Sequence, residues 1–180
     1  MRTRTRSTAA LAVAGLGLTT LAALGLSSPA AAAPASAQEC RGVAATIIGT
    51  SGSDEIEGTS GRDVIVALAG HDEIDGNGGN DLICAGSGND EVDGGRGSDT
   101  IWGQAGRDDI DGGSGSDRIA GQAGNDDLAG GSGNDRISGG SGRDTIEGER
   151  GNDRLSGGSG NDRVYQGSEP DRDDDDRYDD

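Results

Sequence analysis

A branched aliphatic residue recurs at every ninth position between Gly49 and Tyr165. Counted from Gly49, this stretch divides into 13 nonapeptides without insertion, and position 8 is Ile, Leu or Val in every one, from Ile56 to Val164. The flanking positions 7 and 9 are mostly polar. A three-residue strand that points its middle side chain inward and its neighbours outward produces this pattern. The sequence therefore predicts a repeat architecture in place of an ordinary globular core.

The outward positions repeat every 18 residues. At position 7 the odd-numbered repeats begin with acids, such as Glu55 and Glu73, whereas the even-numbered repeats begin with Val64 and Leu82 and end with arginines. This alternation predicts that successive repeats lie in two opposite sheets. One sheet then has an acidic outer face, and the other has an outer face that is apolar at first and basic later.

Two further positions do not vary within the repeats: position 4 is Gly and position 6 is Asp in all 13. Position 1 is Gly in eleven of them, with Ala67 and Ala85 as the exceptions. This phrase resembles the pattern GGxGxDxUx of the haemolysin-type calcium-binding nonapeptide (RTX) family. The resemblance implies an all-β fold, a right-handed parallel β-roll (a β-solenoid) of 13 nonapeptide repeats with two sheets and with calcium between stacked turns.

The resemblance also implies that the position-6 aspartates of turns 18 residues apart hold the calcium ions together with backbone carbonyls. Seven odd and six even turns leave at most 11 gaps for ions. The implied metal ligands are Asp54, Asp63, Asp72, Asp81, Asp90, Asp99, Asp108, Asp117, Asp126, Asp135, Asp144, Asp153 and Asp162.

Elementary electrostatics agrees with a divalent cation in these gaps. Carboxylates stacked at the inter-strand spacing of about 4.8 Å repel one another by roughly 3–4 kcal/mol at an effective dielectric near 20. Calcium accepts six to eight oxygens, carboxylate or carbonyl, whereas magnesium demands a stricter octahedron. The third turn departs most from the pattern, with Ala67 and Leu68 in place of two glycines, so gaps 54/72 and 72/90 are expected to be the weakest. His71 in that turn is interpreted as a turn residue.

The composition limits the function classes. The chain has 180 residues, 36 of them Gly, and a formal net charge of −18. A chain this acidic is not expected to bind nucleic acid or an anionic membrane surface through its charge. It has one His, no Lys, and neither a nucleophile elbow nor a phosphate loop. The sequence therefore predicts no enzyme activity.

Both ends of the chain differ from the repeats. Residues 1–37 have a basic start, an apolar run from Ala9 to Leu26 and small residues at Ala35 and Ala37, which is typical of a cleaved secretory signal peptide. They predict a secreted, extracellular protein without a membrane anchor. Residues 166–180 contain eight acids and two arginines and are expected to form a disordered tail.

Residues 38–48 are expected to form a capping strand, because Ile47 falls at position 8 of a prelude that lacks the Asp. The segment before this strand is expected to fold over an apolar patch of Val64, Val66, Leu82 and Trp102. That arrangement brings Cys40 towards Cys84, and two cysteines in an exported chain favour a disulfide.

The favoured function is that of a secreted calcium-binding protein whose folding is driven by calcium. One alternative is an adhesion or matrix module that docks on a partner through the apolar patch around Trp102. Another is an ice-binding or carbohydrate-binding roll, which a flat, regular ladder of Thr or aromatic residues would support. Only Thr50 and Thr59 share position 2, and they belong to adjacent repeats of opposite sheets. Apart from calcium, the sequence identifies no partner.

Overall fold

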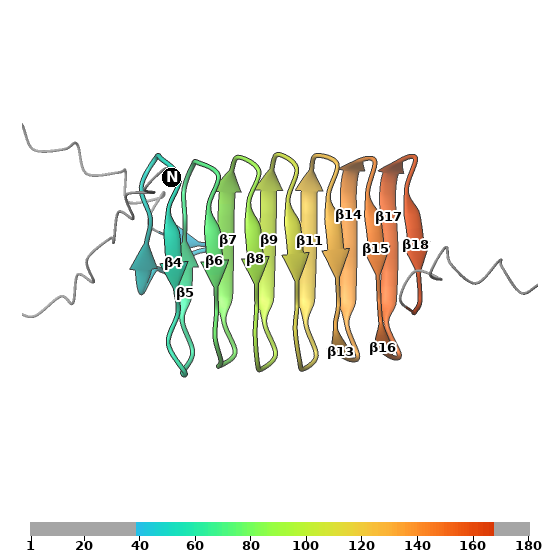
Figure 1. Cartoon of the computed structure of the whole chain (residues 1–180), viewed down its shortest axis with the longest axis horizontal. Helices are drawn as coiled ribbons and strands as arrows, with labels where there is room; N and C mark the ends of the chain where they lie inside the picture. Colours follow the sequence, from blue (N-terminus) through green and yellow to red (C-terminus); the bar gives the residue numbers. More distant parts are fainter. Residues whose placement is uncertain (1–38, 168–180) are drawn as a thin grey trace, which may run out of the picture.

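The computed structural model describes residues 39–167 and forms a parallel β-roll of two seven-stranded sheets. The strands lie side by side along the length of the molecule, and the two ends of the described chain lie at opposite ends of the roll (Figure 1). The even sheet, built from the even-numbered repeats, contains β3 (Ile47–Ile48), β5 (Val64–Val66), β7 (Leu82–Ser87), β9 (Thr100–Ala105), β11 (Arg118–Ala123), β14 (Arg136–Gly142) and β17 (Arg154–Gly160).

The odd sheet contains the strands of the odd-numbered repeats. Its members are β4 (Glu55–Glu57), β6 (Glu73–Asp75), β8 (Glu91–Asp93), β10 (Asp109–Asp111), β12 (Asp127–Ala129), β15 (Thr145–Glu147) and β18 (Arg163–Tyr165). Paired residues in both sheets differ by 18 in number, as Ile110 and Leu128 do. The predicted fold, with successive repeats in opposite sheets, is therefore confirmed.

The core consists mainly of the position-8 side chains, one from each strand of the two sheets. Ile74, Ile83, Ile101 and Ile146 are among the fully buried side chains, and all belong to one cluster. Their neighbours at positions 7 and 9 of the odd sheet are mostly exposed, as in β10, whose burial alternates exposed, buried, exposed. The period-two geometry of a short strand thus explains why position 8 is the one position that is a large aliphatic residue in every repeat.

The turns are stacked by backbone hydrogen bonds of their own. The position-3 amide of one turn donates to the position-2 carbonyl of the turn below, as Ser114 does to Gly95 at 2.8 Å. The position-4 amide donates to the position-3 carbonyl of the turn above, as Gly97 does to Ser114 at 2.8 Å. This ladder extends five strands of the even sheet into their turns and adds the two-residue strands β13 (Ser132–Gly133) and β16 (Arg150–Gly151). The turns therefore have a regular backbone pairing of their own.

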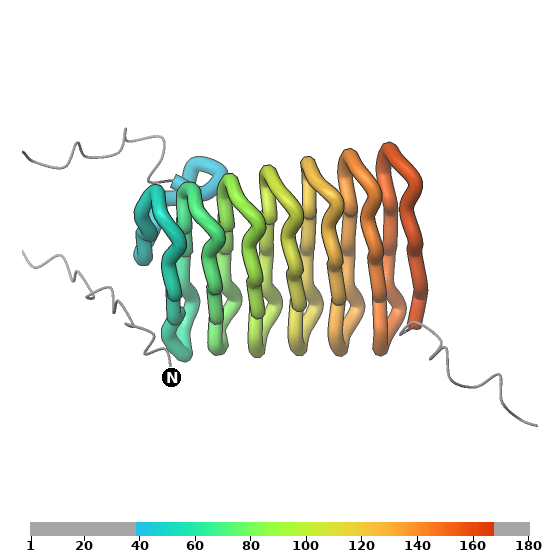
Figure 2. Tube along the Cα trace, turned by 45° about the horizontal axis from the view of Figure 1, so that its top comes forward, coloured from blue at the N-terminus to red at the C-terminus, as the bar shows by residue number. Residues whose placement is uncertain are grey.

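The N-terminal segment forms a hairpin followed by an edge strand. β1 (Glu39–Cys40) pairs antiparallel with β2 (Val43–Ala44), and β3 then pairs with β5 through Ile47 and Ile65. The hairpin lies against the outside of the first coils (Figure 2). Of residues 39–48, Ile47 and Ile48 form the strand that pairs with β5, and the Thr46 amide donates to the Val64 carbonyl at 2.8 Å. The hairpin residues before Thr46 turn back over the outer face of the sheet.

The hairpin covers the apolar patch of the even sheet. Cys40 packs against Val64, Val66 and Cys84, which are each at most 5% exposed, and Trp102 packs at the margin of the cluster. The predicted Cys40–Cys84 disulfide is confirmed, with Cα atoms 5.8 Å apart, within the range that a disulfide spans. The guanidinium of Arg41 lies 5.1 Å from the Trp102 ring centroid. The surface invoked for adhesion is thus occupied by the chain itself.

Candidate metal sites

The 13 position-6 aspartates form two parallel ranks, one at each edge of the roll. Each Asp directly precedes a strand, so the sheet register places the carboxylates of successive coils above one another. Ten of them are almost completely buried although no cation of the described chain pairs with them: Asp63, Asp72, Asp81, Asp90, Asp99, Asp108, Asp117, Asp126, Asp135 and Asp144. Asp54, Asp153 and Asp162 are half-buried at the ends of the ranks.

One carboxylate oxygen of these aspartates is used to hold the coils together. In all eleven gaps the backbone amide of the lower Asp donates to the Oδ1 atom of the Asp 18 residues later, at distances between 2.7 and 3.1 Å. The first of these bonds joins Asp54 to Asp72 and the last joins Asp144 to Asp162. Oδ1 therefore has a structural partner in the turn below.

The second oxygen has no partner in the inner turns. The Oδ2 atoms of nine aspartates are buried without a hydrogen bond within the described chain: Asp72, Asp81, Asp90, Asp99, Asp108, Asp117, Asp126, Asp135 and Asp144. An ionised oxygen buried in this way is costly unless a positive charge or a donor reaches it. Nine such atoms in two regular ranks indicate that these turns are built to bind a cation.

In seven of these nine turns the orphaned oxygen faces the position-1 glycine of its own turn. A methyl group added to Gly112 would lie 3.0 Å from Asp117 Oδ2 and 2.9 Å from the Gly130 carbonyl oxygen of the turn above. Gly94 and Gly130 have the same arrangement with their own Asp and the carbonyl above. Oxygens from two successive turns thus converge on each gap, and the absence of a side chain at position 1 leaves the gap open.

The two N-terminal turns close on themselves. Thr50 donates its backbone amide and its hydroxyl to Asp54 Oδ2 at 2.6 and 3.0 Å, and Thr59 does the same to Asp63 Oδ2 at 2.7 and 2.8 Å. In the later turns position 2 has a positive φ, even where it is not glycine, as at Leu68 and Gln104. Gaps 54/72 and 63/81 therefore lack the free oxygen that the other nine gaps have.

Alanine fills the space in two further turns of the odd rank. Ala67 and Ala85 stand at position 1, and both methyl groups are fully buried in the core cluster. Gaps 72/90 and 90/108 therefore combine a free Oδ2 with a filled space. Seven gaps have both the free oxygen and the open glycine: 81/99, 99/117, 108/126, 117/135, 126/144, 135/153 and 144/162.

The electrostatics of the ranks is most unfavourable in the middle. Burial raises the pKa of Asp108 and of Asp117 to about 7, and neighbouring aspartates in the same rank add to the rise, although the backbone amide bonded to each lowers it. Burial likewise raises the pKa of Asp99 and of Asp126 to about 6. Without a cation these carboxyls therefore ionise at a higher pH than an exposed Asp does, as desolvated acids do.

His71 belongs to a second ladder, formed by position-5 side chains. Where the position-5 residue of the turn below is Ser, Asn or His, its side chain accepts from the position-5 amide above: Asn89 donates to His71 Nδ1 at 2.8 Å, and Arg107 donates to Asn89 Oδ1 at 2.9 Å. The His71 amide itself donates to Ser53. This bonding supports the interpretation of His71 as a turn residue. The spacing of Ser, Asn and His at position 5 is the sequence signal that could have revealed the ladder.

The donor set fits calcium better than a metal that prefers side-chain clusters. Within residues 39–167 no group of three or more His, Cys, Asp or Glu side chains converges as a metal site. Each gap instead offers two carboxylates and carbonyl oxygens, which are the hard oxygen ligands that calcium accepts in flexible geometry.

Within residues 39–167 no helix is long and apolar enough to cross a bilayer.

Comparison with known proteins identifies one family. A family model described as the RTX calcium-binding nonapeptide repeat (4 copies) matches residues 48–83, 85–119, 111–146, 130–164 and 138–171, so the matches cover most of the chain. No curated protein matches the sequence significantly.

Proposed function

Since the chain belongs to the RTX calcium-binding nonapeptide repeat family, we propose that it is a secreted, non-enzymatic protein whose β-roll folds when it binds calcium. The observation that carries this proposal is the set of nine buried Asp Oδ2 atoms without a partner. In six of these turns the carbonyl oxygen of the next turn lies close to the same position-1 glycine as the free Oδ2 atom. A calcium ion in a gap would be the positively charged partner that the two carboxylates lack within the described chain.

The residues divide the gaps into three classes. Seven gaps have a free Oδ2 and an open glycine, and we assign these as the principal calcium sites. The gaps that begin at Asp72 and Asp90 are weaker sites because the methyl groups of Ala67 and Ala85 occupy the space. The gaps that begin at Asp54 and Asp63 are already satisfied by Thr50 and Thr59. These contacts favour nine ions over the eleven that the number of gaps allows.

Coupling between calcium binding and folding follows from what the roll lacks. Its core is one file of aliphatic side chains, and its ranks of acids repel until they are neutralised. The glycine-rich turns lose more conformational entropy on folding than other sequences do. Because the gaps exist only once the coils are stacked, calcium-binding energy appears as folding energy.

Secretion is the second part of the proposal. It rests on the basic and apolar character of residues 1–37, which lie outside the described residues. The disulfide between Cys40 and Cys84 supports it, because such bonds persist in oxidising compartments. A chain that needs calcium to fold would stay unfolded in a calcium-poor cytosol, cross the membrane and fold outside.

Circular dichroism with a metal titration tests the proposal. Protein that starts at Gln38 is expected to give a disordered far-UV spectrum in chelator and a β spectrum above a steep calcium threshold. Magnesium at equal concentration has a much smaller effect, and sodium chloride, which screens charge but does not cross-link turns, does not replace calcium. Native mass spectrometry is expected to count up to nine ions. A chain that is β-rich in chelator and unchanged by calcium contradicts the proposal.

A further inference from the structure

A row of arginines runs along the basic end of the even sheet. Arg118, Arg136 and Arg154 are paired in register on β11, β14 and β17, so their side chains stack at the inter-strand spacing of about 4.8 Å. All three are exposed, and within residues 39–167 none of them forms an ion pair. Stacked like charges without counter-ions are unfavourable. This arginine row is therefore a surface that lacks its anionic partner.

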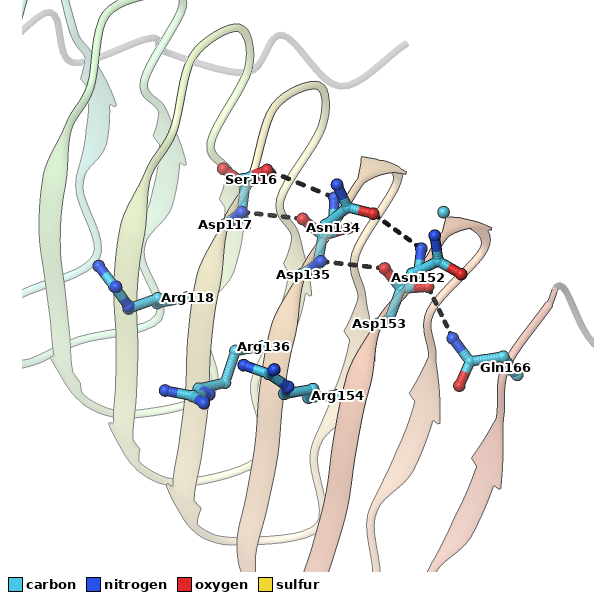
Figure 3. A pocket seen from close by; sticks show the side chains of 11 residues that line it. Ser116, Asp117, Arg118, Asn134, Asp135, Arg136, Asn152, Asp153, Arg154 and Gln166 are labelled. Atoms are coloured by element: carbon cyan, nitrogen blue, oxygen red, sulfur yellow. Dashed lines mark hydrogen bonds between the residues drawn. The ribbon is translucent and has the colours of Figure 1, made fainter.

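The arginine row lines a groove of about 640 Å³, and three aspartates of the even rank, Asp117, Asp135 and Asp153, line the same groove. Calcium in gaps 117/135 and 135/153 would offset the charge of these carboxylates, so the groove of the calcium-loaded roll is positive. The other wall of the groove is the ladder of Ser116, Asn134 and Asn152, whose side chains run parallel to the arginines (Figure 3). At position 9 of the same strands the residues are small, Ala120, Ser138 and Ser156, so nothing large stands beside the guanidinium groups. An extended chain with acidic side chains fits such a shallow groove.

The chain leaves the roll at the end of this groove. Gln166 is one of the lining residues, and its Nε2 atom donates to Asp153 Oδ2 at 3.0 Å (Figure 3). Residues 168–180 follow directly and contain eight acids and two arginines. Thirteen extended residues reach about 43 Å, whereas the arginine row spans two inter-strand steps, about 10 Å. The acidic segment is therefore long enough and correctly tethered.

We propose that the acidic segment 168–180 docks in cis on the arginine row of Arg118, Arg136 and Arg154. Opposite charges on the two surfaces provide the attraction, and tethering at Gly167 gives the segment an effective concentration that a free partner rarely reaches. The docked segment covers the most basic surface of an acidic protein. An external polyanion would then reach the arginines only by displacing it.

This inference rests on the proposed function in one respect, because calcium in gaps 117/135 and 135/153 would offset the charge of the aspartates that line the groove. A paramagnetic label tests it in the full calcium-loaded chain. Asp175→Cys gives a single free thiol for a nitroxide, because the two native cysteines of the chain form the disulfide. The label is expected to broaden the amide signals of Ala120 and Ser138 and to leave those of Glu73 and Glu91 on the odd sheet unchanged. The broadening disappears in 0.5 M NaCl, because exposed ion pairs are screened.

Two arginine variants and a mixed sample make the test decisive. Arg136→Gln is expected to reduce the broadening about twofold, the size of effect of an exposed ion pair. Arg163→Gln, a matched change on β18 of the odd sheet, leaves it unchanged. Circular dichroism in calcium verifies that both variants fold. Docking in cis would be overturned by equal broadening of both sheets, or by broadening that does not respond to Arg136→Gln or to salt. Broadening between differently labelled molecules in a mixed sample would also overturn it and would identify a second copy as the occupant.

Discussion

At the residue scale, each inner position-6 aspartate has two oxygens with different roles. In Asp117 the Oδ1 atom accepts the Asp99 amide at 2.7 Å, which fixes the coil below. The Oδ2 atom is buried, has no partner and faces the Gly130 carbonyl across the gap. One side chain thus supports the stack directly and at the same time creates a charge that the stack cannot tolerate without a cation.

Asp117→Asn separates these two roles. The amide retains an oxygen for the Asp99 amide and offers a donor to the Gly130 carbonyl, so the metal-free chain is expected to be no less stable. A calcium site loses a charged ligand, worth about 1.5–3 kcal/mol. If a loss of about 2 kcal/mol in binding free energy is spread over seven coupled sites, the calcium concentration at the midpoint rises roughly 1.6-fold. This conversion uses about 1.4 kcal/mol for each tenfold change in concentration. Calcium titration by circular dichroism measures this rise.

Asp109→Asn is the matched control. Asp109 is an exposed position-7 residue of β10, so its substitution removes the same charge from the outer face. Equal calcium midpoints for the two variants would argue against Oδ2 of Asp117 as a ligand.

The space at position 1 gives a second prediction. Gly112→Ala places a methyl group 2.9 Å from the Gly130 carbonyl and 3.0 Å from Asp117 Oδ2. Overpacking of this kind costs about 1–3 kcal/mol, and here it falls on the calcium-bound state, so the calcium midpoint is expected to rise. Ala85→Gly opens a filled space and is expected to lower the midpoint.

Gly61→Ala serves as the control for the methyl group. Its nearest neighbour would be Thr59 Oγ1 at 3.9 Å, and it lies in a turn whose carboxylate Thr59 already satisfies. Calcium titrations of the three variants decide the prediction, and an unchanged midpoint for Gly112→Ala would show that no ligand occupies the space.

The invariant residues of the repeat could be interpreted from the sequence, but the exceptions could not. Asp at position 6 and Gly at position 4 have a fixed period, so stacking follows from counting. Thr50 and Thr59 appear in the sequence only as two hydroxyl residues, and their bonds to Asp54 and Asp63 depend on the φ angle at position 2. A backbone dihedral that differs between equivalent turns leaves no trace in the repeat pattern.

At the element scale, the strands were predictable and the N-terminal hairpin was only partly so. The 18-residue alternation of position 7 fixes the two sheets and their register. The residues before Ile47 have no repeat to follow, and the sequence indicated only that this segment covers the apolar patch. The structure adds the antiparallel pairing of β1 with β2 and the contact of Arg41 with Trp102. These features arise from tertiary contacts of a segment that is too short to have a pattern.

The hairpin gives a prediction at the same scale. Two-residue strands are not stable alone, so the disulfide is expected to hold the hairpin on the patch. Closing a loop of 44 residues contributes about 4 kcal/mol in the chain-entropy description. Cys40→Ser with Cys84→Ser, or reduction in calcium, is expected to release the hairpin and shift the emission of Trp102, the only Trp of the chain, to the red.

The far-UV spectrum of the double variant should remain that of a β-roll, because the other strands do not depend on the bond. Arg41→Gln keeps the disulfide and removes only the cation–π contact, so its emission should shift less. An unchanged emission after complete reduction would show that packing alone holds the hairpin.

At the scale of the whole molecule, the two ranks behave as one charged array whose middle is under the greatest strain. The pKa values that burial raises furthest belong to the central turns, about 7 at Asp108 and Asp117 and about 6 at Asp99 and Asp126. Each of these four is buried, and the charge of a neighbouring aspartate of the same rank adds to the rise of its pKa. Desolvation and repulsion therefore oppose ionisation of the folded, metal-free roll more than of the unfolded chain.

Proton linkage turns this array into the last prediction. For these acids the folded pKa is higher than the unfolded value of about 3.9, so between pH 4 and pH 7 the unfolded chain releases protons that the folded roll keeps. Stability of the metal-free roll is therefore greatest at or below about pH 4 and is lost as the pH rises towards 7. Metal-free protein at pH 4.5 should show more β signal than at pH 7.5, as though protons partly replaced calcium.

Calcium binding responds in the opposite direction, because the ligand carboxyls must be ionised. The calcium concentration at the midpoint should therefore rise as the pH falls from 7.5 to 5.5. Circular dichroism at the two pH values measures both effects, and sodium chloride at pH 7.5 controls for screening alone. A metal-free chain that loses structure on acidification, or a calcium midpoint that does not depend on pH, would mean that the buried aspartates are not the groups that calcium neutralises.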